Sequence, residues 1–178
     1  MTGAKDPRQW RFEPDGAMPN NPQFPVLLYQ HALPENDPAG ALERLFSAHG
    51  WEGTWRNGVF RYHHYHSGAH EVLGIARGSA ELLIGGEGGA RLSVRAGDIL
   101  VLPAGTGHKN LDNSDDFLIV GAYPPGQHAE IETGPAGEAE RRRIARLPLP
   151  QTDPVEGRTG PLLRLWRADT SQLEDGRS

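Results

Sequence analysis

Four side chains of the kinds that bind metal ions lie close together in the middle of the chain: His64, His66, Glu71 and His108. Imidazole and carboxylate groups suit divalent transition metals such as Fe(II), Mn(II), Ni(II) and Zn(II). The chain has no cysteine, which excludes thiolate metal sites, disulfides and cysteine nucleophiles. The residue types therefore predict one divalent metal ion with coordination positions left open for water, substrate or dioxygen.

Hydrophobic alternation indicates which elements position these ligands. Residues 58–66 and 71–75 both alternate with the period of a β-strand, so every second side chain shares a face. One face of the first segment carries Phe60, Tyr62, His64 and His66, and one face of the second carries Glu71, Leu73 and Ile75. Because these faces also hold bulky apolar residues, we expect them to line a barrel interior, where desolvated ligands need a cation as partner.

The same alternation predicts the surroundings of the metal. Residues 91–95 alternate clearly, with Leu92 and Val94 on the inner face. We expect the pocket walls to be formed by Phe60, Tyr62, Leu73, Ile75, Leu92 and Val94. Glu71 either completes the metal shell or acts as an acid or base beside it. His63 and His70 are expected to face outward, although a shifted ligand set that uses His66 and His70 is an alternative.

The remaining segments indicate an all-β protein with a few peripheral helices. Abundant Gly (23) and Pro (15) favour short strands joined by tight turns. Further strands are predicted at residues 25–30, 98–102, 116–123 and 161–166, with a hairpin loop at 85–89. Helices are predicted after Asp37, as the N-cap, up to Gly50, and over residues 136–147. We expect an N-terminal arm (1–24), one barrel domain (25–166) and a frayed tail (167–178).

Charge and hydrophobicity exclude some partners. The net charge is −5 and no basic stripe is evident, so nucleic acid is not expected as a partner. The longest apolar run, residues 117–123, is too short to span a membrane, and residues 1–10 do not resemble a signal peptide. These features predict a cytoplasmic protein with a small-molecule partner.

Two motifs resemble the signatures of the cupin superfamily. The first is Gly58-x5-His64-x-His66-x4-Glu71-x6-Gly78, and the second is Gly97-x5-Pro103-x-Gly105-x2-His108, with Asp112 where the family usually has Asn. More narrowly, residues 60–74 and 121–127 are similar to single-domain cupins of the YjlB type, a functionally uncharacterised group. The resemblance implies a double-stranded β-helix (a jelly-roll barrel), with one metal held by His64, His66, Glu71 and His108. Members of this superfamily often form dimers through their outer strands, so the resemblance also suggests a homodimer.

The family includes dioxygenases, isomerases and non-catalytic binders, so the fold does not determine the function. We expect a metal-dependent enzyme, dioxygenase- or isomerase-like, that acts on a small polar organic substrate. Two alternatives are a non-catalytic protein that binds or senses a small molecule or metal, and a metal that only stabilises the barrel.

Overall fold

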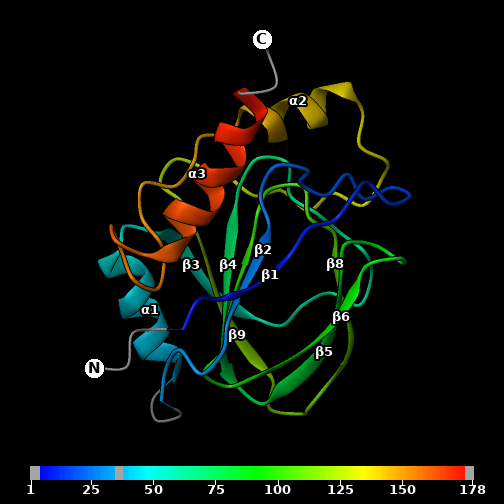
Figure 1. Cartoon of the computed structure of the whole chain (residues 1–178). Helices are drawn as coiled ribbons and strands as arrows, with labels where there is room; N and C mark the ends of the chain where they lie inside the picture. The colour runs from blue at the N-terminus through cyan, green and yellow to red at the C-terminus, as the bar shows by residue number, and fades with distance from the viewer. Residues whose placement is uncertain (1–4, 35–37, 175–178) are drawn as a thin grey trace.

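The structure is a computed structural model of the chain, and it describes residues 5–34 and 38–174, with the backbone alone for 168–174. In these residues the strands form two antiparallel sheets, and three helices lie outside them (Figure 1). The predicted all-β fold with a few peripheral helices is confirmed. Asp37, the expected helix cap, lies outside the described residues.

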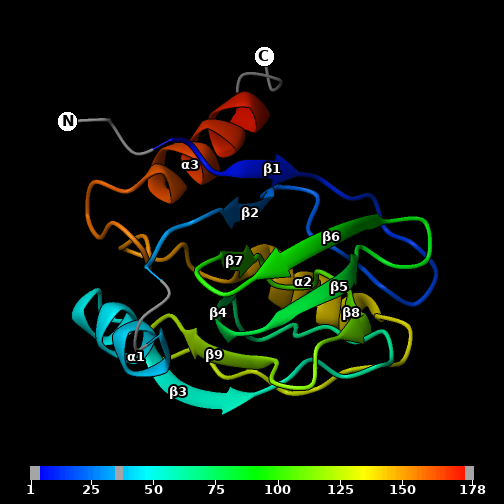
Figure 2. The ribbon, with the colours of Figure 1, turned by 90° about the horizontal axis from the view of Figure 1, so that it is seen from below.

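The two sheets face each other, as in a jelly roll (Figure 2). The larger sheet contains, in spatial order, β1 (Arg8–Trp10), β2 (Val26–Tyr29), β7 (Ile99–Leu102), β4 (Glu71–Arg77), β9 (Leu118–Tyr123) and β3 (Glu52–Asn57). The smaller sheet contains β6 (Ala90–Arg95), β5 (Ser79–Ile84) and β8 (His108–Asn113).

Strand β4 is buried on both faces and separates two apolar clusters. Its residues Leu73 and Ile75 point toward the smaller sheet, where they pack in one cluster with Leu92 of β6. Val72 and Ala76 point the other way, into a second cluster beneath the helices. Burying a large aliphatic side chain of this kind contributes about 1.5–3 kcal/mol, so the strand that begins with Glu71 is held firmly.

The helices cover the outer face of the larger sheet and one end of the molecule. Helix α1 (Pro38–Ala48) buries Leu42 and Phe46, which lie four residues apart on one helical face. Helix α2 (Glu138–Arg146) buries Ile144, and α3 (Pro161–Glu174) buries Leu162 and Trp166. The prediction of a strand at residues 161–166 was wrong: Leu162 and Trp166 have the i, i+4 spacing of a helix that begins at Pro161.

The predicted strand at residues 58–66 is replaced by an extended but irregular segment. It makes isolated bridges, His64 with His108 and Tyr65 with Glu132, in place of a continuous ladder. Because the segment divides its backbone hydrogen bonds between β8 and a second partner, no regular strand forms. The backbone bends at residues 61–62, and the two-residue alternation persists at His64 and His66, which both belong to the histidine cluster described below.

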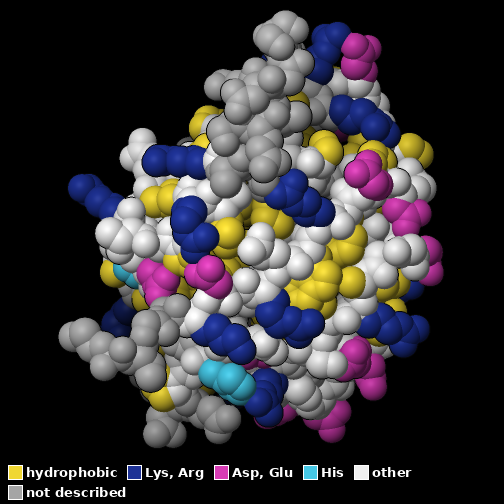
Figure 3. Space-filling model, viewed as in Figure 1, with side chains coloured by type: hydrophobic (Ala, Val, Ile, Leu, Met, Phe, Trp, Pro, Cys, Tyr) yellow, Lys and Arg dark blue, Asp and Glu magenta, His cyan; other side chains and the backbone are white. Residues whose placement is uncertain are grey.

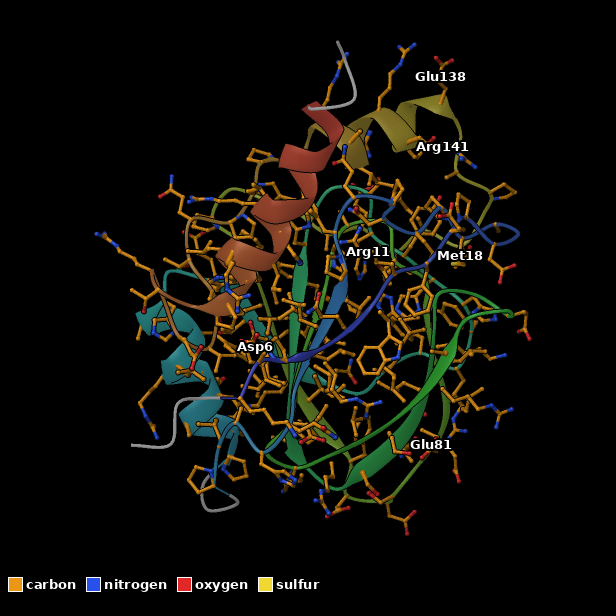
Figure 4. The ribbon with its side chains drawn as sticks, viewed as in Figure 1. Asp6, Arg11, Met18, Glu81, Glu138 and Arg141 are labelled. Carbon is orange, nitrogen blue, oxygen red and sulfur yellow. The ribbon has the colours of Figure 1, made fainter. Side chains whose placement is uncertain are left out.

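The predicted division into arm, domain and tail stays a prediction. Strand β1, from the expected arm, pairs with β2, and α3 continues past residue 166. Arg164 of α3 also donates a hydrogen bond of 2.9 Å to Asp6, which is labelled in Figure 4. No helix in the described part of the chain combines the length and apolar character needed to cross a membrane. On the face shown in Figure 3, basic, acidic and apolar side chains are interspersed.

Candidate metal centre

Three histidines converge where the irregular segment meets β8. The backbones of His64 and His108 exchange two hydrogen bonds, of 3.2 and 2.9 Å, which places the two residues directly opposite each other. His66 follows on the same side of the segment, and its carbonyl accepts from Gly105 N at 2.8 Å. One ring nitrogen from each histidine lies within 4.8 Å of the other two. The structure thus brings together three of the four predicted ligands as one cluster.

Each ring is oriented by a backbone carbonyl. The Nδ1 atoms of His64, His66 and His108 lie 3.0, 2.6 and 3.0 Å from the carbonyl oxygens of Tyr62, Glu130 and Thr106. A carbonyl oxygen only accepts hydrogen bonds, so each Nδ1 must carry the proton. In the neutral ring, Nε2 then keeps its lone pair, which is the form that ligates a metal.

Burial keeps two of these rings uncharged. His64 is 4% exposed and His108 is 3% exposed. Desolvation lowers the pKa of His64. Desolvation, followed by the repulsion that protonated His64 or His66 would exert, lowers the pKa of His108 well below its ordinary value. His66 differs: burial opposes its charged form, but the nearby negative charge of Glu71 outweighs burial and raises its pKa. The cluster therefore offers two neutral rings together with His66, whose proton on Nε2 a metal ion would displace.

Glu71, the first residue of β4, faces two of the histidines. Its two carboxylate oxygens lie 3.6 Å from Nε2 of His66 and 3.6 Å from Nε2 of His108. The side chain is almost completely buried. Among the described residues, Glu71 does not belong to the tight group of three, but its carboxylate borders the same space. This position suits either a fourth ligand or a base beside the metal.

Tyr123 and Trp55 also reach this site, which the sequence did not indicate. Trp55 Nε1 donates to the Tyr123 hydroxyl at 2.8 Å. Burial, and then the negative charge of Glu71, raises the pKa of Tyr123, so its hydroxyl stays protonated beside that carboxylate. Trp55 can lie against β9 because its partner in register is Gly121, where a Cβ would lie 2.2 Å from the indole. Trp55 thus holds the Tyr123 hydroxyl close to Glu71.

Residues 128–134, which we call the strap, cross the segment that carries the histidines. The strap provides the Glu130 carbonyl that orients His66. Its Glu132 pairs through the backbone with Tyr65, and its carboxylate accepts from Ser67 N at 2.6 Å and Ser67 Oγ at 2.9 Å. At Gly68 a Cβ would lie 2.5 Å from the carbonyl oxygen of His128, so the close approach of the strap requires glycine there.

A cavity of about 190 Å³ opens onto the cluster. Its walls include the three histidines, Glu71 and the following residues: Trp55, Asn57, Gly58, Val59, Phe60, Leu73, Tyr123 and Ile131. Of the predicted pocket residues, Phe60 and Leu73 lie in these walls. Tyr62 stacks on Phe60 outside them, and Ile75, Leu92 and Val94 lie in the apolar cluster between the sheets.

The two neighbouring histidines lie away from the cluster. His63 bonds through Nε2 to Glu87, on the hairpin loop between β5 and β6. His70 is fully buried beside the rings of Phe24 and Trp166, on the helix-covered side of the larger sheet. Its Nδ1 accepts a hydrogen bond from Ala104 N, so His70 is a core residue and the alternative ligand set of His66 and His70 is not assembled.

Facing antiparallel sheets with a histidine cluster of this kind define a cupin. The chain belongs to the YjlB family: it is 43% identical to the uncharacterised protein YjlB of Bacillus subtilis (strain 168) over 164 residues, which cover 91% of this chain and 98% of YjlB. No family model matches the chain.

Several solved structures resemble the chain weakly. A DUF861 family protein from Thermotoga maritima is 21% identical, with 54% of this chain and 96% of that chain covered and a TM-score of 0.33. Acireductone dioxygenase from Bacillus anthracis, solved with a cadmium ion in its active centre, is 17% identical, with 61% and 78% covered and a TM-score of 0.37. TM-scores this low carry no conclusion about activity.

Proposed function

We propose that this chain is a metal-dependent enzyme acting on a small organic molecule, with one divalent transition-metal ion held by His64, His66 and His108. The observation that carries the proposal is the orientation of the three rings. Every Nδ1 donates to a backbone carbonyl, so three Nε2 lone pairs are directed into one buried space. A cation there would satisfy groups that otherwise have only one another and Glu71 as partners.

The cavity favours a metal that meets substrate over a metal that only stabilises the barrel. All three histidines and Glu71 border an opening of about 190 Å³. A structural site is normally closed by protein ligands, whereas a catalytic site keeps a position open. A divalent transition metal supplies Lewis acidity and, if it is redox-active, the capacity to react with dioxygen.

Glu71 is the residue we propose as proton acceptor. Of the described residues that line the cavity, Glu71 is the one that carries a carboxylate group. An isomerase-like reaction requires such a base beside the substrate. The Tyr123 hydroxyl lies near this carboxylate, and Trp55 in turn holds Tyr123. Glu71 itself borders the cavity and faces His66 and His108, a position that suits either a metal ligand or a proton acceptor.

The test is metal content in a set of histidine variants. Protein purified without added metal is measured by elemental analysis for the unaltered chain, His66→Ala, His108→Ala and His63→Ala. We expect the first two variants to lose metal tenfold or more and His63→Ala to retain it, because His63 bonds to Glu87 outside the cavity. Equal metal content in all four proteins would contradict the ligand assignment.

Chelation separates the catalytic from the structural role. If the ion serves catalysis, the metal-free chain should still fold, because the sheets carry their own apolar clusters, and its melting temperature should fall only to the extent of the binding free energy that is lost. Unfolding on chelation would instead support a metal that holds the barrel together.

A further inference from the structure

The large apolar side chains that are most exposed gather at the mouth of the cavity. In the described part of the chain these are Phe60, Tyr62 and Ile131, at 41%, 46% and 52% exposure. Phe60 and Ile131 line the cavity, and Tyr62 stacks on Phe60 with ring centroids 5.0 Å apart. Both aromatic rings also meet the His64 ring edge-on, at 5.3 and 5.7 Å. Single exposed apolar residues are ordinary, but a group of them around one opening marks a binding surface.

Away from the histidines and Glu71, the inner walls of the cavity are largely apolar. Trp55, Val59 and Leu73 supply apolar surface beside the polar groups already described. None of the lining residues, all of which belong to the described part of the chain, is Lys or Arg.

The basic residues nearest in sequence to this lining have partners elsewhere. Arg56 pairs with Glu43, and Arg61 donates to Asn113 at 3.1 Å. Lys109 lies 3.8 Å from Glu87. A substrate anion placed away from the metal would therefore be desolvated against apolar walls without a counter-ion, which is unfavourable.

The volume limits the part of a ligand that enters. An apolar cavity of about 150 Å³ is large enough to hold benzene. The present cavity, about 190 Å³, therefore has room for one ring or a short branched chain together with a small polar group. A longer molecule would extend over the stacked pair of Phe60 and Tyr62.

We propose that the substrate is an uncharged molecule with an oxygen donor at one end and an aromatic ring or branched alkyl group at the other. The oxygen end faces the three histidines, and the apolar end packs between Phe60 and Ile131. This inference rests on the proposed function, because the oxygen end requires a metal. It narrows the expected small polar substrate to one whose polar atoms are confined to one end.

The test uses three hydroxamates as metal-directed probes on the Co(II)-loaded protein, whose visible absorption reports ligand binding. Acetohydroxamate carries only the metal-binding group, benzohydroxamate adds an uncharged ring, and 4-carboxybenzohydroxamate adds a charge to that ring. We expect benzohydroxamate to bind at least tenfold more tightly than acetohydroxamate, and the carboxylated probe to lose at least tenfold relative to benzohydroxamate.

Variants at the cavity mouth test which side chains cause the difference in affinity between benzohydroxamate and acetohydroxamate. Phe60→Ala and Ile131→Ala should weaken benzohydroxamate severalfold and leave acetohydroxamate unchanged. Both side chains are more than one-third exposed, so these variants should fold. Tyr62→Phe is the matched control: it keeps the stacked ring and should change neither affinity.

Each contrary result has a distinct meaning. Equal affinities for acetohydroxamate and benzohydroxamate in a protein that binds Co(II) would overturn the substrate inference and leave the proposed metal site standing. Failure to bind Co(II) would overturn both. If Phe60→Ala separates a dimer into monomers without altering the ratio of the two affinities, the apolar mouth is a contact between two copies of the chain and the inference is wrong.

Discussion

Replacing Glu132 by alanine tests whether the strap holds a metal ligand in place. The Glu132 carboxylate accepts two hydrogen bonds from Ser67, and the strap carries the carbonyl that orients His66. Hydrogen bonds to a charged group contribute about 1.5–3 kcal/mol each, so Glu132→Ala should weaken the local attachment of the strap by about 3 kcal/mol or more.

Only part of this lost energy should appear as weaker metal binding, because the backbone pairing of residue 132 with Tyr65 still holds the strap. Loss of a group that orients a ligand typically lowers metal affinity by about 10- to 100-fold, and we expect this range for Glu132→Ala. Glu132→Gln should fall between the two proteins, because an amide can still accept one bond from Ser67.

The assay is competition with a coloured chelator for Zn(II), with Glu130→Gln as the matched control. Glu130 orients His66 through its backbone carbonyl and its own side chain is exposed, so this variant should keep the affinity of the unaltered protein. Unchanged affinity in Glu132→Ala, or an equal loss in Glu130→Gln, would refute the role assigned to the strap.

Two further outcomes concern the packing around the site. Burial lowers the pKa of His70 to about 3. Between about pH 6.5 and 3 the unfolded state therefore takes up a proton at this residue and the folded state does not. As the pH falls through that window, the free energy of unfolding should decrease by up to about 5 kcal/mol. His70→Asn should flatten this part of the dependence of unfolding free energy on pH, measured by urea unfolding; an unchanged slope would contradict the explanation. Gly121→Ala should displace the Trp55 indole, lower the free energy of unfolding by about 1–3 kcal/mol and shift the tryptophan fluorescence emission. An unchanged emission spectrum and an unchanged free energy of unfolding would contradict the importance of this contact.

The shared direction of the His64 and His66 side chains could be predicted from the sequence, because it depends only on the local backbone between them. Two residues that are two positions apart point the same way whether the backbone forms a full ladder or isolated bridges, as at His64 and His66. The regular strand predicted for that segment does not form, yet the side-chain directions are as predicted.

Depth within the barrel could not be predicted in the same way. Alternation identifies which face a side chain takes but not its height along the axis, and for this reason Ile75, Leu92 and Val94 point inward and still lie away from the cavity. Trp55 was missed because β3 is mostly exposed and polar, so its sequence shows no alternation. Tyr123 was missed because it ends β9, an apolar strand that is buried along most of its length and therefore does not alternate either. The apolar run at residues 161–166 was too short to distinguish a strand from the first turns of a helix.

The central claim is that three Nε2 atoms bind one metal ion. The most direct measurement is anomalous diffraction at the zinc absorption edge from crystals of the Zn(II)-loaded protein. We expect one peak about 2.0–2.1 Å from Nε2 of His64, His66 and His108, with every Nδ1 still bonded to its carbonyl. A peak at another position, or rings turned to bind through Nδ1, would contradict it.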